Sequence, residues 1–125
     1  MAKKTILIVD DEDAVRMLLK GMLAAEGFSV TAVSSGKECL DLLSKKKPDL
    51  IIMDQMMPQM TGIDTLRQIK QNPATKDVKV LFLSVVTVKE MGENILTSLD
   101  IIDYMEKPFN QAEFIGKVKR AVGLR

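Results

Sequence analysis

Acidic, hydroxyl and basic side chains follow apolar runs at widely separated places in this sequence. Asp10 and Asp11 directly follow one such run, and Asp54 follows a second. Ser84 closes a third run, and Lys107 stands two residues after a fourth. Three carboxylates, a hydroxyl and an ammonium in one crevice would suit a divalent cation and a phosphoryl group. The question is therefore whether the fold brings these residues together.

The apolar runs are short and rich in β-branched residues, and helical stretches separate them. This alternation is typical of a parallel α/β sheet, in which the carboxyl ends of the strands share one edge. We therefore expect the polar residues that follow the strands to converge. The predicted strands are 5–10, 28–33, 49–53, 78–83 and 101–105.

Apolar residues at spacings of three and four predict a helix after each strand. In the first helix, which Gly27 ends, this stripe consists of Val15, Leu18, Leu19, Met22 and Leu23. The fourth helix, 87–99, is weaker because Gly92, Asn94 and Thr97 lower its helix propensity. We expect that segment to be a movable element. The remaining helices are predicted at 36–44, at 63–72 and from 110 to 122.

Composition limits the classes of function. The 125 residues are 46% hydrophobic and 28% charged, which suits one domain over 1–125 with one core. The net charge of +1 gives no general attraction to nucleic acid or to anionic membranes. One cysteine and no histidine exclude an internal disulfide, the usual zinc sites and imidazole catalysis. Without a leader or an apolar run of about 18 residues, we expect no membrane insertion and a cytoplasmic location.

The ordered set of polar residues resembles a response-regulator receiver domain of two-component systems, of the CheY-like, single-domain kind. The resemblance covers nearly the whole chain and rests on the strand-end residues and on the segment 54–62, Asp-Gln-Met-Met-Pro-Gln-Met-Thr-Gly. It implies a flavodoxin-like, doubly wound α/β fold, (βα)5, with five parallel strands in the order 2-1-3-4-5 and five helices. It also implies a phosphoprotein that a sensor histidine kinase or a phosphotransfer protein phosphorylates.

Carboxylates that lie close together repel one another, and each pair about 4 Å apart costs on the order of 4 kcal/mol at an effective dielectric constant of 20. A cation removes this cost. Mg²⁺, or Mn²⁺, suits Asp11 and Asp54 as direct ligands, with Asp10 bound directly or through water. The resemblance adds the main-chain carbonyl of Met56 as a further ligand.

The resemblance gives each remaining residue a role. Asp54 would be the phosphoacceptor, and Lys107 and Ser84 would each contact a phosphoryl oxygen. The Lys107–Pro108 peptide bond would be cis. Tyr104 would turn inward after phosphorylation, and this would change the surface of the fourth helix, fifth strand and fifth helix for a downstream target protein.

Simpler interpretations of single residues stay open. Asp11 could serve simply as a helix cap, Ser84 as a turn hydroxyl and Lys107 as a surface cation. Tyr104 can be a fixed, half-buried aromatic residue whose hydroxyl faces water.

This chain departs from the receiver pattern near the expected site. Val85 replaces a small alanine, so it should narrow the access of small phosphodonors to Asp54. The two side chains beside the route of an attacking water, Met56 and Val86, are apolar, so we expect slow hydrolysis of the aspartyl phosphate. Asp100 replaces a glycine, and Ile101 and Ile102 after it would extend an apolar binding or dimer surface.

Other classes fit less well. An aspartate-nucleophile phosphatase needs a carboxylate where Met56 stands, and a nucleotide-binding loop needs glycines where Asp10 and Asp11 stand. We therefore expect a signalling phosphoacceptor, not an enzyme, that makes no contact with nucleic acid. Two alternatives remain: the receiver part of a longer regulator with an output domain, for example a DNA-binding one, or an interaction module that is not phosphorylated. The end of the last helix, at 122–125 without a linker, favours a stand-alone protein.

Overall fold

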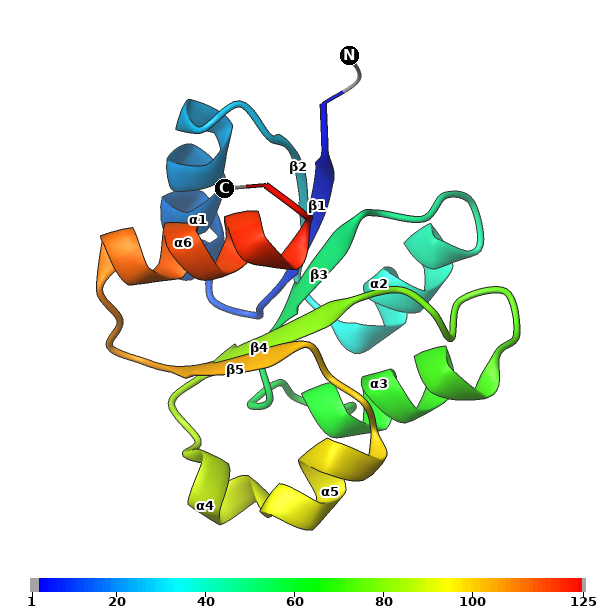
Figure 1. Cartoon of the computed structure of the whole chain (residues 1–125). Coiled ribbons are helices and arrows are strands. Elements are labelled where there is room, and N and C mark those ends of the chain that lie inside the picture. The colour runs from blue at the N-terminus through cyan, green and yellow to red at the C-terminus, as the bar shows by residue number, and fades with distance from the viewer. Residues whose placement is uncertain (1–2, 125) are drawn as a thin grey trace.

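A five-stranded parallel sheet forms the centre of the computed structural model, which describes residues 3–124 (Figure 1). The strand order is β2-β1-β3-β4-β5, as predicted. Every β3 residue is buried, because β3 lies between β1 and β4 and helices cover both faces of the sheet. The strands are β1 (Thr5–Val9), β2 (Ser29–Val33), β3 (Leu50–Met53), β4 (Val80–Ser84) and β5 (Asp103–Glu106).

Helices cover the two faces of the sheet and form two separate apolar cores. Leu19 and Leu23 of α1 and Phe114 and Val118 of α6 pack on one face. The other helices pack on the opposite face, as Figure 1 shows. The helices are α1 (Asp13–Ala25), α2 (Gly36–Leu43), α3 (Gly62–Gln71), α4 (Val88–Met91), α5 (Glu93–Ser98) and α6 (Gln111–Ala121).

The prediction of five helices was wrong, because the fourth helical segment is divided into α4 and α5. Gly92 between them has a φ of 94°, which a continuous right-handed helix does not permit. The Thr87 side chain accepts a hydrogen bond from the Glu90 backbone N–H, and the Glu90 side chain accepts one from the Thr87 backbone N–H. This capping box starts α4 as a separate short element. Only Met91 of α4 and Leu96 of α5 are buried, so this segment is weakly attached to the core.

Two further local predictions differ from the structure. Leu18 does not join the buried stripe of α1, since 55% of its surface is exposed. The last strand begins at Asp103, not at Ile101, and Ile101 packs against the core before the strand starts. Ile102 is exposed, as predicted for this surface. Within residues 3–124, no helix has the length and apolar character needed to span a membrane.

Gly62, the first residue of α3, lies against the strand end that carries Asp54. A Cβ atom at this position would lie 2.3 Å from the main-chain oxygen of Asp54 and 2.8 Å from Cε1 of Phe82. Backbone atoms cannot move away as a flexible side chain can. The absence of a side chain therefore allows the loop after Asp54 to close on β4.

We expect Gly62→Ala to lower the free energy of unfolding by about 1–3 kcal/mol, because it overpacks this contact. Gly21→Ala is the matched control, since a methyl group added at Gly21 in α1 would meet no atom within 4 Å. That change should raise the free energy of unfolding by about 0.5–1 kcal/mol through helix propensity. Urea unfolding followed by circular dichroism measures both, and equal stability of Gly62→Ala and wild type would contradict the close packing.

Candidate functional site

The carboxyl ends of four strands deliver the predicted polar residues to one edge of the sheet. Asp10 and Asp54 directly follow β1 and β3, Ser84 is the last residue of β4, and Lys107 follows β5. Backbone hydrogen bonds continue between the strand ends: Asp54 N donates to the carbonyl of Val9 at 3.0 Å, and Lys107 N donates to the carbonyl of Ser84 at 2.8 Å. The ladder of the sheet thus fixes where these side chains start.

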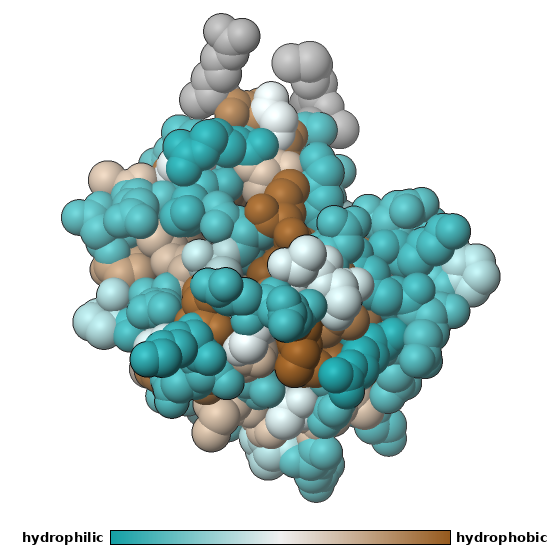
Figure 2. All heavy atoms as spheres, turned by 60° about the horizontal axis from the view of Figure 1, so that its bottom comes forward, coloured by the Kyte–Doolittle hydropathy of each residue, from teal (hydrophilic) through white to brown (hydrophobic). Residues whose placement is uncertain are grey.

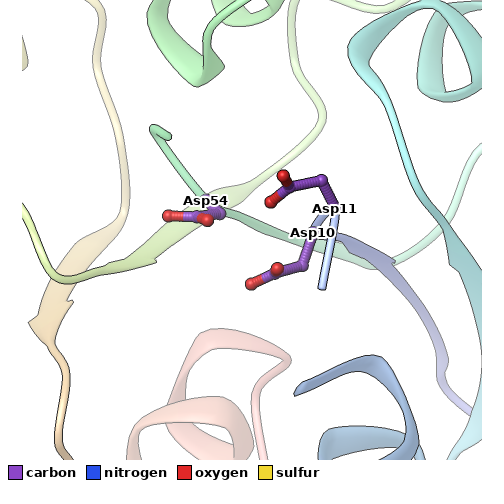
Figure 3. A group of neighbouring side chains, drawn as sticks. All are labelled: Asp10, Asp11 and Asp54. Carbon is purple, nitrogen blue, oxygen red and sulfur yellow. The ribbon is translucent and has the colours of Figure 1, made fainter. Parts of the chain in front are cut away.

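Asp10, Asp11 and Asp54 form an acidic cluster whose ligand oxygens all lie within 4.8 Å of one another. Their carboxylates extend toward a common space beyond the strand ends, as Figure 3 shows. Asp10 and Asp54 are 2% and 4% exposed, and Asp11 is exposed to solvent. Two of the three carboxylates are therefore largely removed from water before any cation is considered.

Lys107 is the only cation within ion-pair distance of the buried carboxylates in the described part of the chain. Its Nζ lies 2.9 Å from Oδ2 of Asp10 and 3.9 Å from Oδ2 of Asp54. Three carboxylates and one ammonium leave two negative charges without a partner. Closely spaced hard oxygen ligands with excess negative charge fit a divalent cation such as Mg²⁺.

Burial raises the pKa of Asp54 above its ordinary value, and the nearby Asp10 carboxylate acts in the same direction. The Ser84 hydroxyl and the Lys107 ammonium oppose this by favouring the ionised form. The net rise in pKa means that ionised Asp54 is disfavoured in the metal-free site. A bound cation would favour the ionised form of Asp54 and so lower its pKa again.

The loops after the strands hold the acidic side chains in place. Glu12 N donates to Oδ1 of Asp10 at 2.9 Å, and Met56 N donates to Oδ1 of Asp54 at 3.3 Å. The Gln55 side-chain oxygen accepts a hydrogen bond from Ile63 N at 2.8 Å, which ties the loop to the start of α3. Each buried carboxylate therefore retains a second oxygen that is not used by these backbone donors.

Sequence reasoning missed Arg16 and Gln55. The Nη1 of Arg16 donates to the main-chain carbonyl of Asp10 at 2.7 Å, and its Nη2 pairs with Asp13. An arginine one turn into a helix and a glutamine beside an aspartate are common surface residues. No signal in a single sequence distinguishes Arg16 and Gln55 from ordinary surface arginines and glutamines.

Ser84 and Tyr104 are linked through Val86. Ser84 is completely buried, and its hydroxyl oxygen accepts a hydrogen bond from Val86 N at 3.3 Å. The Tyr104 hydroxyl donates to the Val86 carbonyl, and the Tyr104 ring stacks on Phe82 with centroids 5.8 Å apart. Burial, assisted by nearby carboxylates, raises the pKa of Tyr104 to about 12, so its hydroxyl remains a donor. The ring already lies inward in this structure, whereas the sequence interpretation has it turning inward after phosphorylation.

The rim of the site is partly apolar. Met56 and Val85 are 58% and 61% exposed, and Val86 is half-buried. The Lys107–Pro108 peptide bond on the other side of the site is cis. Of the residues singled out from the sequence, Asp10, Asp11, Asp54 and Lys107 converge. Ser84 is buried at the end of the neighbouring strand, and Tyr104 is linked to it only through hydrogen bonds to Val86.

Comparisons with known proteins agree with this geometry. The family model described as "Response regulator receiver domain" matches residues 6–119. The Phosphate regulon transcriptional regulatory protein PhoB of Rhizobium meliloti is 36% identical over 115 residues, which cover 91% of this chain and 50% of PhoB. The chain spans about half the length of the curated relatives it matches.

Two solved structures match over nearly their full length. Chemotaxis protein CheY4 of Vibrio cholerae has a TM-score of 0.88 at 27% identity, with 96% of this chain and 99% of CheY4 covered. The receiver domain of sensor histidine kinase PA1611 from Pseudomonas aeruginosa PAO1 has a TM-score of 0.86 at 25% identity, with 98% and 99% covered. In that structure a magnesium ion is coordinated in the active site cleft.

We expect Asp54→Asn to stabilise the metal-free protein, because it removes one charge from an undercompensated cluster. The raised pKa of Asp54 sets the sign of the pH dependence. Protonated Asp54 is favoured in the folded protein, so the stabilisation that its proton gives is complete below pH 3.8, the ordinary pKa. This stabilisation is lost as the pH rises through the raised pKa of the folded state. The advantage of Asp54→Asn over wild type should therefore grow as the pH rises above 3.8, until Asp54 is fully ionised in the folded protein.

Urea unfolding in the presence of EDTA at several pH values measures this difference. Asp41→Asn is the control, because Asp41 is an exposed acidic residue on α2. It should show no comparable gain. A constant difference between wild type and Asp54→Asn across the pH range would contradict the assigned direction of the Asp54 pKa.

Proposed function

This chain belongs to the response regulator receiver domain family, and from that membership we propose that Asp54 accepts a phosphoryl group in two-component phosphorelay signalling. The donor would be a sensor histidine kinase or a phosphotransfer protein. The observation that carries the proposal is the acidic cluster, in which Asp54 is buried beside Asp10, Asp11 and the Lys107 ammonium. The chain is thus a signalling protein whose chemistry is limited to its own phosphorylation and dephosphorylation.

Asp10, Asp11, Asp54 and the main-chain carbonyl of Met56 would hold Mg²⁺ or Mn²⁺. The two unpartnered negative charges of the cluster support this assignment, since hard carboxylate oxygens suit either ion. When bound, the cation supplies positive charge that reduces the repulsion between Asp54 and an incoming phosphoryl group.

A carboxylate oxygen of Asp54 would attack the phosphorus atom of the donor. The new O–P bond forms while the bond between phosphorus and the donor's imidazole nitrogen breaks, and the imidazole leaves with the electron pair. Lys107 would shift from its ion pair toward a phosphoryl oxygen, because its Nζ is 3.9 Å from Asp54. The Ser84 hydroxyl would donate to another phosphoryl oxygen.

The phosphorylated state would act on a partner-binding surface through Ser84. If the Ser84 hydroxyl turns toward the phosphoryl group, the contact between Ser84 and Val86 N changes. Val86 in turn accepts the hydrogen bond of Tyr104. We propose that phosphorylation shifts the population of Tyr104 positions and with it the surface formed by α4, α5, β5 and α6, where a downstream target protein would bind.

The proposed activity does not depend on the length of the natural protein. We propose that residues 1–125 act as a single receiver domain that works in the cytoplasm and makes no direct contact with nucleic acid. Its relatives such as PhoB are transcriptional regulators about twice as long, which also supports the alternative of a receiver part that precedes an output domain. Phosphorylation of Asp54 would have the same chemistry in a single-domain protein and in the receiver part of a longer regulator.

We expect incubation with acetyl phosphate and Mg²⁺ to add the mass of one phosphoryl group to the wild type. Asp54→Ala should show no gain, because the nucleophile is missing, and EDTA should suppress the gain in the wild type. Intact-mass spectrometry gives the answer directly. If the small donor fails, Val85→Ala tests whether Val85 blocks its access, since Val85 lies exposed beside Ser84. Failure of both proteins with acetyl phosphate and with phosphoramidate would contradict the proposed function.

We also expect a slow loss of the phosphoryl group, because Met56 and Val86 offer no polar side chain to orient a water molecule. Met56→Asn or Val86→Glu should accelerate dephosphorylation on the order of tenfold by supplying one. Met56→Leu is the size-matched apolar control and should decay as the wild type does. The time course of intact mass after donor removal measures the rates, and equal decay of all four proteins would refute this explanation.

A further inference from the structure

A shallow groove of about 460 Å³ lies between α4, α5 and the start of β5. Apolar side chains contribute part of its lining: Val88, Leu96, Ile101 and Tyr104. Three acidic residues, Glu93, Asp100 and Asp103, line it as well. No lysine or arginine is among the described residues that line the groove. The groove lining therefore combines apolar side chains with negatively charged ones.

Only one of the three acids is neutralised. Lys117 of α6 pairs with Asp103, with its Nζ 3.2 Å and 3.0 Å from the two carboxylate oxygens. Among residues 3–124, the carboxylates of Glu93 and Asp100 take part in no ion pair. Lys70 approaches Asp100, but its Nζ donates to the main-chain carbonyl at 3.4 Å. The groove thus presents two exposed negative charges that lack an ion-pair partner in this chain.

Asp100 occupies a backbone conformation that most residues avoid. Its φ is +52°, in the left-handed region where glycine has no steric cost and aspartate is tolerated. A carboxylate is therefore held at the edge of the groove at a position where a glycine would be less strained. Asp100 directly follows the α5 C-cap residue Leu99, and its backbone N–H donates to the Thr97 carbonyl, so the end of α5 fixes where this carboxylate starts.

We propose that this groove binds a partner segment that carries lysine or arginine side chains along one side and apolar side chains along the other. The apolar side chains would lie against Leu96, Ile101 and Tyr104, and the cations would face Glu93 and Asp100. The proposal rests on the proposed function, because it specifies the chemistry of the downstream target. Association is expected to be fast and salt-dependent, since complementary charges steer the encounter.

Other occupants fit the charges less well. A second copy of this chain that set its groove directly against this one would bring two negatively charged surfaces together. Nucleic acid would bring phosphates to the same carboxylates. Figure 2 shows one face of the molecule, on which hydrophobic residues form an interrupted band between hydrophilic ones.

The groove is connected to the acidic cluster by hydrogen bonds. Tyr104 lines the groove and donates to the Val86 carbonyl, and Val86 N donates to Ser84 in the site. A change at Ser84 can therefore alter the position of one groove side chain. We expect the affinity for the cationic segment to rise when Asp54 is phosphorylated, and Tyr104→Ala to remove that rise.

The test uses two fluorescein-labelled synthetic helical peptides with the same leucine pattern, one with lysine and arginine on its polar face and the other with glutamate. Fluorescence anisotropy measures their binding to wild type, to Glu93→Gln/Asp100→Asn and to Asp41→Asn/Asp77→Asn. The last is the matched control, because it changes the net charge equally with exposed acids outside the groove. We expect the groove variant to bind the cationic peptide about five- to tenfold more weakly than wild type and control.

Equal binding of the cationic peptide to both double variants would overturn the proposal, as would equal binding of the two peptides to the wild type. Concentration-dependent dimerisation of the wild type that the groove variant loses would also overturn it, by showing a second copy as the occupant.

Intact mass after acetyl phosphate treatment separates this proposal from the proposed function. Phosphorylated protein with unchanged peptide affinity would overturn the groove as a regulated surface and leave the phosphoacceptor function intact. If no phosphoryl group is gained, the proposed function fails, and charge-dependent binding to the untreated protein still decides whether the groove is a docking surface.

Discussion

Electrostatic repulsion among three carboxylates at one edge of the sheet is the constraint on which the rest of this structure depends. Asp10 and Asp54 are buried side by side, and the single ammonium of Lys107 offsets only part of their charge. Such an arrangement persists only because other interactions hold it. The parallel ladder fixes the two strand ends, and backbone N–H groups of Glu12 and Met56 bond the carboxylates directly. The stability of two apolar cores thus supports a site that is unfavourable by itself in the metal-free state.

Phe82 connects that site with the groove beyond it. Its ring lies where a side chain on Gly62 would otherwise fit, next to the main-chain oxygen of Asp54. The Phe82 ring also stacks on the ring of Tyr104. Phe82 is fully buried in the middle of β4, so it is closely packed on all sides. Tyr104 therefore rests on the same rigid strand that carries Ser84.

The sheet, its strand order and most of the site could be predicted from the sequence, because both depend on strong local patterns. Apolar runs of four or five residues mark buried strands, and the residues after them must meet at one edge in a parallel sheet. The break at Gly92 could not be predicted, since a single glycine is tolerated in many helices and its φ depends on how α5 packs. Leu18 was placed in the core because its spacing fits a stripe, but α1 buries only a narrower part of that stripe. Arg16 and Gln55 act through main-chain partners that only the folded loops provide.

The weak attachment of the α4–α5 segment has a consequence for how such proteins diversify. Met91 and Leu96 are its only buried side chains within α4 and α5, and none of the acidic-cluster residues comes from this segment. Residues 88–98 can therefore change in sequence with little effect on the sheet or on the acidic site, provided that Met91, Leu96 and the glycine at the break, Gly92, are kept. This segment supplies part of the groove lining, while Asp100, Ile101, Asp103 and Tyr104 supply the rest. A gene duplicate could alter one side of this groove by changing this one short stretch, while the acidic cluster at the sheet edge stays the same.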